Sequence, residues 1–215
     1  MMTARLTVCL TLFLLAPALA GGGDGMTQVL DPGAEVAPTQ SATAVVVRKP
    51  KLRAEASVEI AAPADEVWAY LSDNAKAREW SVYFHHITTL DPEAHTRRCY
   101  VNADESGKRW DERVVGEVPS RVRHIDMYAM VDYKVPGSHH YHYDVYQLLE
   151  PLGPNRTRLT FRSAPAKGSG LTQHLIWLGA RRKTSEVFAQ NLANIAAAIE
   201  EGAAYQRRFA YPYPH

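Results

Sequence analysis

The sequence lacks the signatures of several common functional classes. Its 215 residues carry a formal net charge of only +1 at pH 7, so no strong basic field is present to attract nucleic acid. It contains no G-x-S-x-G, H-E-x-x-H, C-x-x-C, P-loop or G-x-G-x-x-G motif. We therefore expect no nucleic-acid partner and no cofactor, and we assign no catalytic residue and no metal ligand.

Long hydrophobic runs are also missing. The apolar run from Leu6 to Leu15 is shorter than the about 20 residues that span a bilayer. It follows Arg5 and leads to Ala18-Leu19-Ala20, a small-x-small pattern that signal peptidase accepts. We predict a signal peptide over residues 1–20, cleavage near Ala20, and export to the periplasm or the exterior of the cell.

Cysteine is scarce as well, with Cys9 and Cys99 only. Cleavage removes Cys9, and a lone thiol cannot form an internal disulfide, so the fold depends on its own core. Cys99 alternates with Arg97 and Arg98 on an expected strand, which favours a buried structural cysteine. Cleavage also removes Arg5 and brings the formal charge to zero.

The remaining chain divides into three parts. Residues 21–53 are rich in glycine, proline and small polar residues and are predicted to form a flexible leader, in which the apolar stretch 44–47 docks on the domain or adds an edge strand. Residues 54–205 have the length of one domain with a substantial core. Residues 206–215 form a tail rich in proline and aromatic residues, which we expect to dock loosely.

The domain pattern predicts an α+β fold. A strand over 57–61 precedes two short helices, the second ending near Trp80. Six further strands are separated by hairpin connectors, which favour an antiparallel meander: 84–91, 97–103, 109–118, 121–131, 139–150 and 157–164. Helical spacing of apolar residues then predicts a long helix that stops at Gly202 and is kinked at Gly179.

Three stretches carry a family resemblance. "VEIAAPADEVWAYLSDNAKAREW" resembles the opening of the SRPBCC superfamily, the START and polyketide cyclase/dehydrase-like helix-grip domains. "LLEPLGPNRTRLTFRSA" and "VFAQNLANIAAAIEEG" are similar to its late hairpin and closing helix, so the resemblance covers residues 54–205. It implies a curved antiparallel sheet wrapped around the long C-terminal helix, with two short helices after the first strand.

The resemblance also implies a deep hydrophobic cavity between sheet and helix. Relatives use this cavity for lipids, sterols, polyketides or hormones, and some catalyse aromatisation or hydrolysis. The superfamily has no universal catalytic residue, so none is carried over. The segment 171–183 departs from the pattern because it is longer than the usual lead-in to the final helix. The resemblance therefore does not determine the shape of the cavity mouth.

A histidine-rich strand, "GSHHYHYDVYQLLEPL" at 137–152, offers candidate ligand contacts. Alternation places His140, His142, Asp144, Tyr146 and Leu148 on one face, and we expect that face to point inward because it includes Leu148.

Four interpretations of these histidines remain open. They could form a metal site with His124 or His86, or an acid–base pair of His142 with Asp144 or Asp126. They could instead be polar cavity lining or a solvated edge. Polar lining is the interpretation we favour.

The resulting hypothesis is an exported protein that binds a hydrophobic or amphipathic, lipid- or polyketide-like small molecule. The alternative is a cyclase-, dehydrase- or hydrolase-like enzyme that uses the same histidines. We expect a monomer and leave transient membrane contact open. The predicted ligand-binding residues are Trp80, Tyr83, Tyr100, Trp110, His124, Tyr128, His140, His142 and Tyr146. Glu112 and Arg113 point in opposite directions, so one of them is expected to be a buried polar anchor.

Overall fold

The computed structural model describes residues 45 and 47–213. The predicted signal peptide and the larger part of the predicted leader therefore lie outside the described residues. Within the described part of the chain, no helix is long and apolar enough to cross a membrane.

A seven-stranded antiparallel sheet forms the framework. Its strands are β1 (Ala54–Ile60), β2 (His86–Asp91), β3 (Thr96–Tyr100), β4 (Arg109–Val118), β5 (Val122–Val131), β6 (Tyr143–Gly153) and β7 (Arg156–Pro165). Their spatial order is β1-β7-β6-β5-β4-β3-β2. The first and last strands in sequence are therefore neighbours, and the other pairs are sequential hairpins, as the turn residues predicted.

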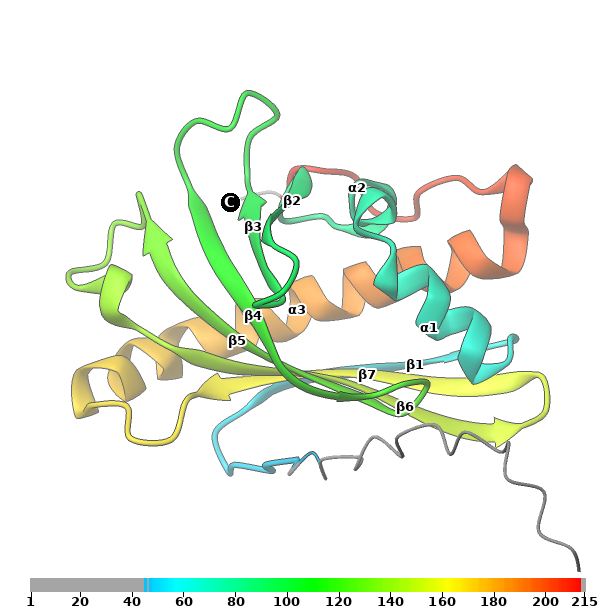
Figure 1. Cartoon of the computed structure of the whole chain (residues 1–215), viewed down its shortest axis with the longest axis horizontal. Coiled ribbons are helices and arrows are strands. Elements are labelled where there is room, and N and C mark those ends of the chain that lie inside the picture. The colour runs from blue at the N-terminus through cyan, green and yellow to red at the C-terminus, as the bar shows by residue number, and fades with distance from the viewer. Residues whose placement is uncertain (1–44, 46, 214–215) are drawn as a thin grey trace, which may run out of the picture. The chain divides into compact units, whose positions relative to one another are not determined.

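Helices cover one face and one end of this sheet. They are α1 (Ala64–Ser72), η1 (Asn74–Lys76), α2 (Ala77–Trp80), η2 (Ser138–His140), α3 (Leu171–Glu201) and η3 (Gly202–Ala204). Figure 1 shows the curved sheet wrapping around α3, with α1 and α2 toward one end. The predicted α+β helix-grip arrangement is confirmed.

The long helix differs from the expectation in one respect. It runs without interruption for 31 residues through Gly179, where a kink was predicted, so that part of the prediction is wrong. It ends at Gly202, whose positive φ of 54° suits a residue without a Cβ.

The C-terminal tail is fixed to the domain. The Asn194 side chain is fully buried; its Oδ1 accepts hydrogen bonds from the Arg208 and Phe209 backbone N–H groups, and its Nδ2 donates to the Trp80 and Phe209 carbonyls. Tyr213 is buried, so the expectation of loose docking is wrong.

The described end of the leader crosses the sheet face opposite α3. Arg48 forms an ion pair with Asp144 of β6, and the Arg162 guanidinium of β7 donates to the Arg48 carbonyl. Gly116 of β4 leaves room for Val45, whose Cγ2 would lie 3.2 Å from a Cβ at that position. The described end of the leader therefore docks here and adds no edge strand to the sheet.

Candidate functional site

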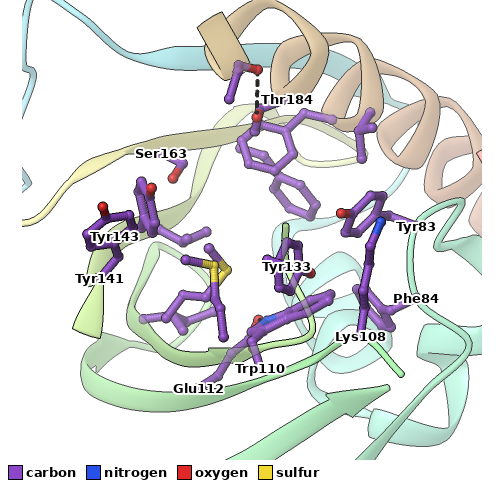
Figure 2. A pocket seen from close by; sticks show the side chains of 18 of the residues that line it. Tyr83, Phe84, Lys108, Trp110, Glu112, Tyr133, Tyr141, Tyr143, Ser163 and Thr184 are labelled. Carbon is purple, nitrogen blue, oxygen red and sulfur yellow. Dashed lines mark hydrogen bonds between the residues drawn. The ribbon is translucent and has the colours of Figure 1, made fainter. Parts of the chain in front are cut away.

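A cavity of about 390 Å³ lies between the sheet and α3. This volume is within the range of roughly 300–1,000 Å³ that is typical of small-molecule sites. Ala180 and Lys183 are the exposed members of its lining, so the cavity opens beside α3. Figure 2 shows side chains from the sheet, from α3 and from the connecting loops converging on it.

Aromatic side chains build much of the cavity wall. Phe84 packs edge-to-face against both Trp80 and Trp110, with ring centroids 5.5 Å apart in each pair. The ring of Phe161 of β7 contacts the rings of Trp80 and of Phe188 of α3, with centroids 6.2 Å and 5.8 Å away. Such rings supply a large, rigid apolar contact surface for a ligand.

One ion pair is built into this wall. Arg97 of β3 and Glu112 of β4 face each other across the register and approach to 2.8 Å (Arg97 Nη2 to Glu112 Oε2). The Trp110 indole N–H donates to the same carboxylate at 3.0 Å. Burial opposes the charge of Arg97, but the charge and hydrogen bond of Glu112 together with the charge of Glu117 favour it, and the pKa of Arg97 is raised. The pair is therefore an internally neutralised polar group, and Glu112 is the buried anchor while Arg113 is exposed.

Two phenols and an ammonium group lie together at another part of the lining. The Tyr83 and Tyr133 hydroxyls are hydrogen-bonded, and burial raises the pKa of both, so both phenols stay protonated at neutral pH. Lys108 Nζ lies 5.8 Å from the centre of the Tyr133 ring. Figure 2 shows the Lys108 side chain extending toward Tyr83.

Three of the nine predicted ligand-binding residues line the cavity: Trp80, Tyr83 and Trp110. The other six do not: Tyr100, His124, Tyr128, His140, His142 and Tyr146.

The inward assignment of the histidine-rich strand is wrong. Leu149, not Leu148, pairs with the buried Leu159, so the inward face of β6 carries Tyr143, Val145 and Gln147. Leu148 and Leu149 are adjacent, so each face of the strand carries one leucine and either face could have been the buried one. A shift of one residue in register exchanges the two faces.

His124 and His142 instead form hydrogen bonds with carboxylates on the outer face of the sheet. His142 Nδ1 contacts Asp126 Oδ1 at 2.9 Å, and His124 Nε2 contacts Asp144 Oδ1 at 3.0 Å. His142 stacks on Tyr128 and His124 stacks on Tyr146.

His140 and Tyr100 also lie away from the cavity. His140 is exposed in η2, where its ring contacts that of His139. Tyr100 stacks on His86 of β2. Neither residue joins the His124 and His142 arrangement.

The histidines that could form a metal site or an acid–base pair do not line the cavity. Among the described residues, no group of three or more His, Cys, Asp or Glu side chains could hold a metal ion. No histidine belongs to the cavity lining within that part of the chain. The His142–Asp126 pair exists, but it lies on the opposite face of the sheet. Cys99 is fully buried and burial raises its pKa, as expected of a structural thiol.

Several lining residues were missed by the sequence analysis. Tyr143, Val145 and Gln147 follow once β6 is placed in its observed register. Lys108 and Tyr133 lie just outside strands, where alternation gives no direction for a side chain. Only their position in the sequence could have indicated them: Lys108 directly precedes β4 and Tyr133 follows β5, each beside the connection between two neighbouring strands.

A family model with the description "Polyketide cyclase / dehydrase and lipid transport" matches residues 51–200. The chain belongs to this family. The SRPBCC resemblance in the sequence is thereby confirmed. No curated protein matches the chain.

Solved structures with the same fold are similar to this chain at low sequence identity. The ZhuI aromatase/cyclase from Streptomyces sp. R1128 is 19% identical with a TM-score of 0.51, over 69% of this chain and 93% of that one. The di-domain aromatase/cyclase BexL of the BE-7585A pathway is 17% identical with a TM-score of 0.53, over 68% of this chain and 47% of that one.

A third structure, DynU16 of the dynemicin biosynthetic locus, is 18% identical with a TM-score of 0.51, over 75% of this chain and 51% of that one. This chain therefore spans about half the length of BexL and of DynU16. At such identities the likeness extends to the fold alone.

Proposed function

We propose that this chain is an exported protein that reversibly binds a hydrophobic or amphipathic small molecule in the cavity between the sheet and α3. The observation that carries the proposal is the cavity of about 390 Å³, whose mainly apolar wall is rich in aromatic side chains. The side chains around an open apolar cavity lack the van der Waals contacts that a well-packed core provides. A bound apolar ligand supplies these contacts.

Family membership supports the same class of ligand. The family description includes lipid transport as well as cyclase and dehydrase activity. The enzyme alternative requires histidines in the cavity, but His124 of β5 and His142, which directly precedes β6, lie on the opposite face of the sheet. Reversible binding therefore remains the proposal best supported by the lining.

Export and ligand can be tested on one sample. Native mass spectrometry of the protein recovered from outside the cytoplasm reports both the N-terminus and any bound molecule. A chain that begins near Gly21 and carries a lipid- or polyketide-sized mass would support both parts of the proposal. Retention of residues 1–20 would contradict export by cleavage.

A cavity-filling substitution tests the location of binding. Ser163 of β7 is 2% exposed, faces the cavity and lies opposite Val145. Ser163→Leu places an isobutyl group in that space, so ligand affinity should fall by about tenfold or more. Three of the four tryptophans line the cavity, so their fluorescence can follow the titration.

The matched control is Thr160→Leu on the other face of the same strand, where the Thr160 hydroxyl contacts Ser57. This variant should bind as the wild type does. Equal binding by wild type and Ser163→Leu would place the ligand elsewhere and overturn the proposed site.

A further inference from the structure

The cavity lining has an unbalanced charge. Its charged side chains are Arg97, Lys108, Lys183 and Glu112, three positive and one negative. Glu112 already pairs with Arg97 at 2.8 Å. Among the residues that the structure describes, neither lysine forms an ion pair, so the lining has a surplus of two positive charges (three minus one).

Lys108 is the decisive member of this set. Lys183 is exposed, so water can solvate its ammonium group. This group also lies 5.2 Å from the centre of the Tyr213 ring. Lys108 is half-buried and reaches into an aromatic environment. A partly desolvated ammonium without a counter-charge loses hydration that only an anion or several hydrogen-bond acceptors can replace.

The aromatic surroundings of Lys108 argue against a cationic ligand. Tyr83 and Trp110 lie with ring centroids 5.9 Å apart, and Tyr133 is hydrogen-bonded to Tyr83. Rings gathered in this way attract a ligand's ammonium group in other proteins. Here the Lys108 ammonium already lies against the Tyr133 ring and would repel a second cation.

Three uncharged polar side chains of the lining are engaged within the protein. Gln147 Oε1 accepts a hydrogen bond from Arg123, Asn191 Oδ1 accepts one from the Val82 backbone, and the Thr184 hydroxyl donates to the Ala180 carbonyl. The lysine is therefore the charged group best placed to select a ligand head group.

We propose that the ligand is an amphiphile with an anionic head group, a carboxylate or a phosphate monoester, which binds at Lys108 while its apolar part occupies the aromatic cavity. The inference rests on the proposed function and adds the charge of the ligand to it. Lys183, at the mouth, contributes to the positive field that favours entry of an anion.

Four single-chain probes of equal length test this inference on the full-length protein. They are tetradecanoate, tetradecyl phosphate, tetradecanol and tetradecyltrimethylammonium, titrated below their aggregation concentrations and followed by tryptophan fluorescence and calorimetry. One or both anions should bind at least about tenfold more tightly than the alcohol and the cation, the effect expected of one charge-assisted hydrogen bond. The stronger anion identifies the head group.

Variants of Lys108 locate the selectivity. Lys108→Met keeps the side-chain length but removes the charge, so it should lower affinity for the preferred anion about tenfold and leave tetradecanol binding unchanged. Lys108→Arg should restore anion binding. Lys134→Met is the matched control, since Lys134 is exposed and does not line the cavity.

The outcomes separate this inference from the proposed function. If the alcohol or the cation binds as tightly as both anions, the head-group inference fails while binding in the cavity stands. Unchanged anion affinity in Lys108→Met would also overturn it. If none of the four probes binds, both proposals fail.

Discussion

Single residues on β6 decide which chemistry meets the ligand. Tyr143 is buried, lines the cavity and packs against Trp177 of α3 with ring centroids 5.3 Å apart. His142, its immediate neighbour, points to the other face and pairs with Asp126. Neighbouring residues at the start of β6 thus belong to two different environments.

Alanine substitutions at these two positions test the face assignment. Tyr143→Ala should weaken ligand binding by about tenfold because it removes part of the cavity wall. His142→Ala should change affinity by less than about twofold. Fluorescence titration of both variants, after circular dichroism confirms that they are folded, checks the prediction. A large loss in His142→Ala with none in Tyr143→Ala would mean that the faces of β6 are reversed.

This residue scale is also where sequence reasoning reached its limit. On β7 the large apolar residues Leu159 and Phe161 share one parity, so the alternation of its sequence alone indicates that both point inward, and both are buried. On β6 the consecutive residues Leu148 and Leu149 place one leucine on each face of the strand. Only the pairing of Leu149 with Leu159 shows which of the two faces points inward. Cross-strand register depends on contacts between distant segments, which one strand's sequence does not contain.

At the scale of elements, α3 organises both the cavity and the chain end. Its apolar spacing predicted its existence, and the stretch VFAQNLANIAAAIEEG carried part of the family resemblance. In the structure, Asn191 and Asn194 of this stretch bind backbone groups of other segments. The sequence predicted the helix from local periodicity, but the partners of its buried amides lie 14 to 114 residues away.

Replacing one of these amides should destabilise the whole domain. Asn194→Ala leaves two carbonyls and two N–H groups without their partner, so the free energy of unfolding should fall by on the order of 3 kcal/mol. Urea unfolding measures this difference.

Gln190→Ala provides the control on the same helix, because Gln190 is only half-buried. It should change the free energy of unfolding by no more than about 0.5 kcal/mol. A loss below about 1 kcal/mol in Asn194→Ala would show that water replaces these hydrogen bonds and that the amide does not anchor the tail.

At the scale of the whole molecule, the sheet separates two kinds of environment. The face toward α3 is mainly apolar, is rich in aromatic side chains and surrounds the cavity. The opposite face carries ion pairs, one of which also fixes the described end of the leader. Two of those carboxylates, Glu55 and Asp144, have lowered pKa values. Burial opposes the shift in each, and hydrogen bonds from Arg53 and Arg162 to Glu55, and from His124 and Arg48 to Asp144, outweigh it.

The lowered pKa of Asp144 predicts a specific dependence of stability on pH. In the unfolded chain this carboxyl takes up a proton near pH 3.9, whereas the folded protein keeps it ionised to lower pH. Its contribution is therefore fully present above about pH 4 and is lost as the pH falls through the folded pKa. Asp144→Asn should lower the free energy of unfolding at pH 7 by roughly 1.5–3 kcal/mol, the range for hydrogen bonds to charged groups.

Urea unfolding of wild type and Asp144→Asn at pH 7 and pH 3 checks this prediction. The gap between the two proteins should narrow at pH 3, because the wild-type carboxylate begins to lose its advantage there while the amide does not titrate. Ligand affinity at pH 7 should be equal in both, since Asp144 lies on the face opposite the cavity. A constant gap across this pH range would show that the ionised carboxylate does not stabilise the outer face, and a changed affinity would show that the two faces are coupled.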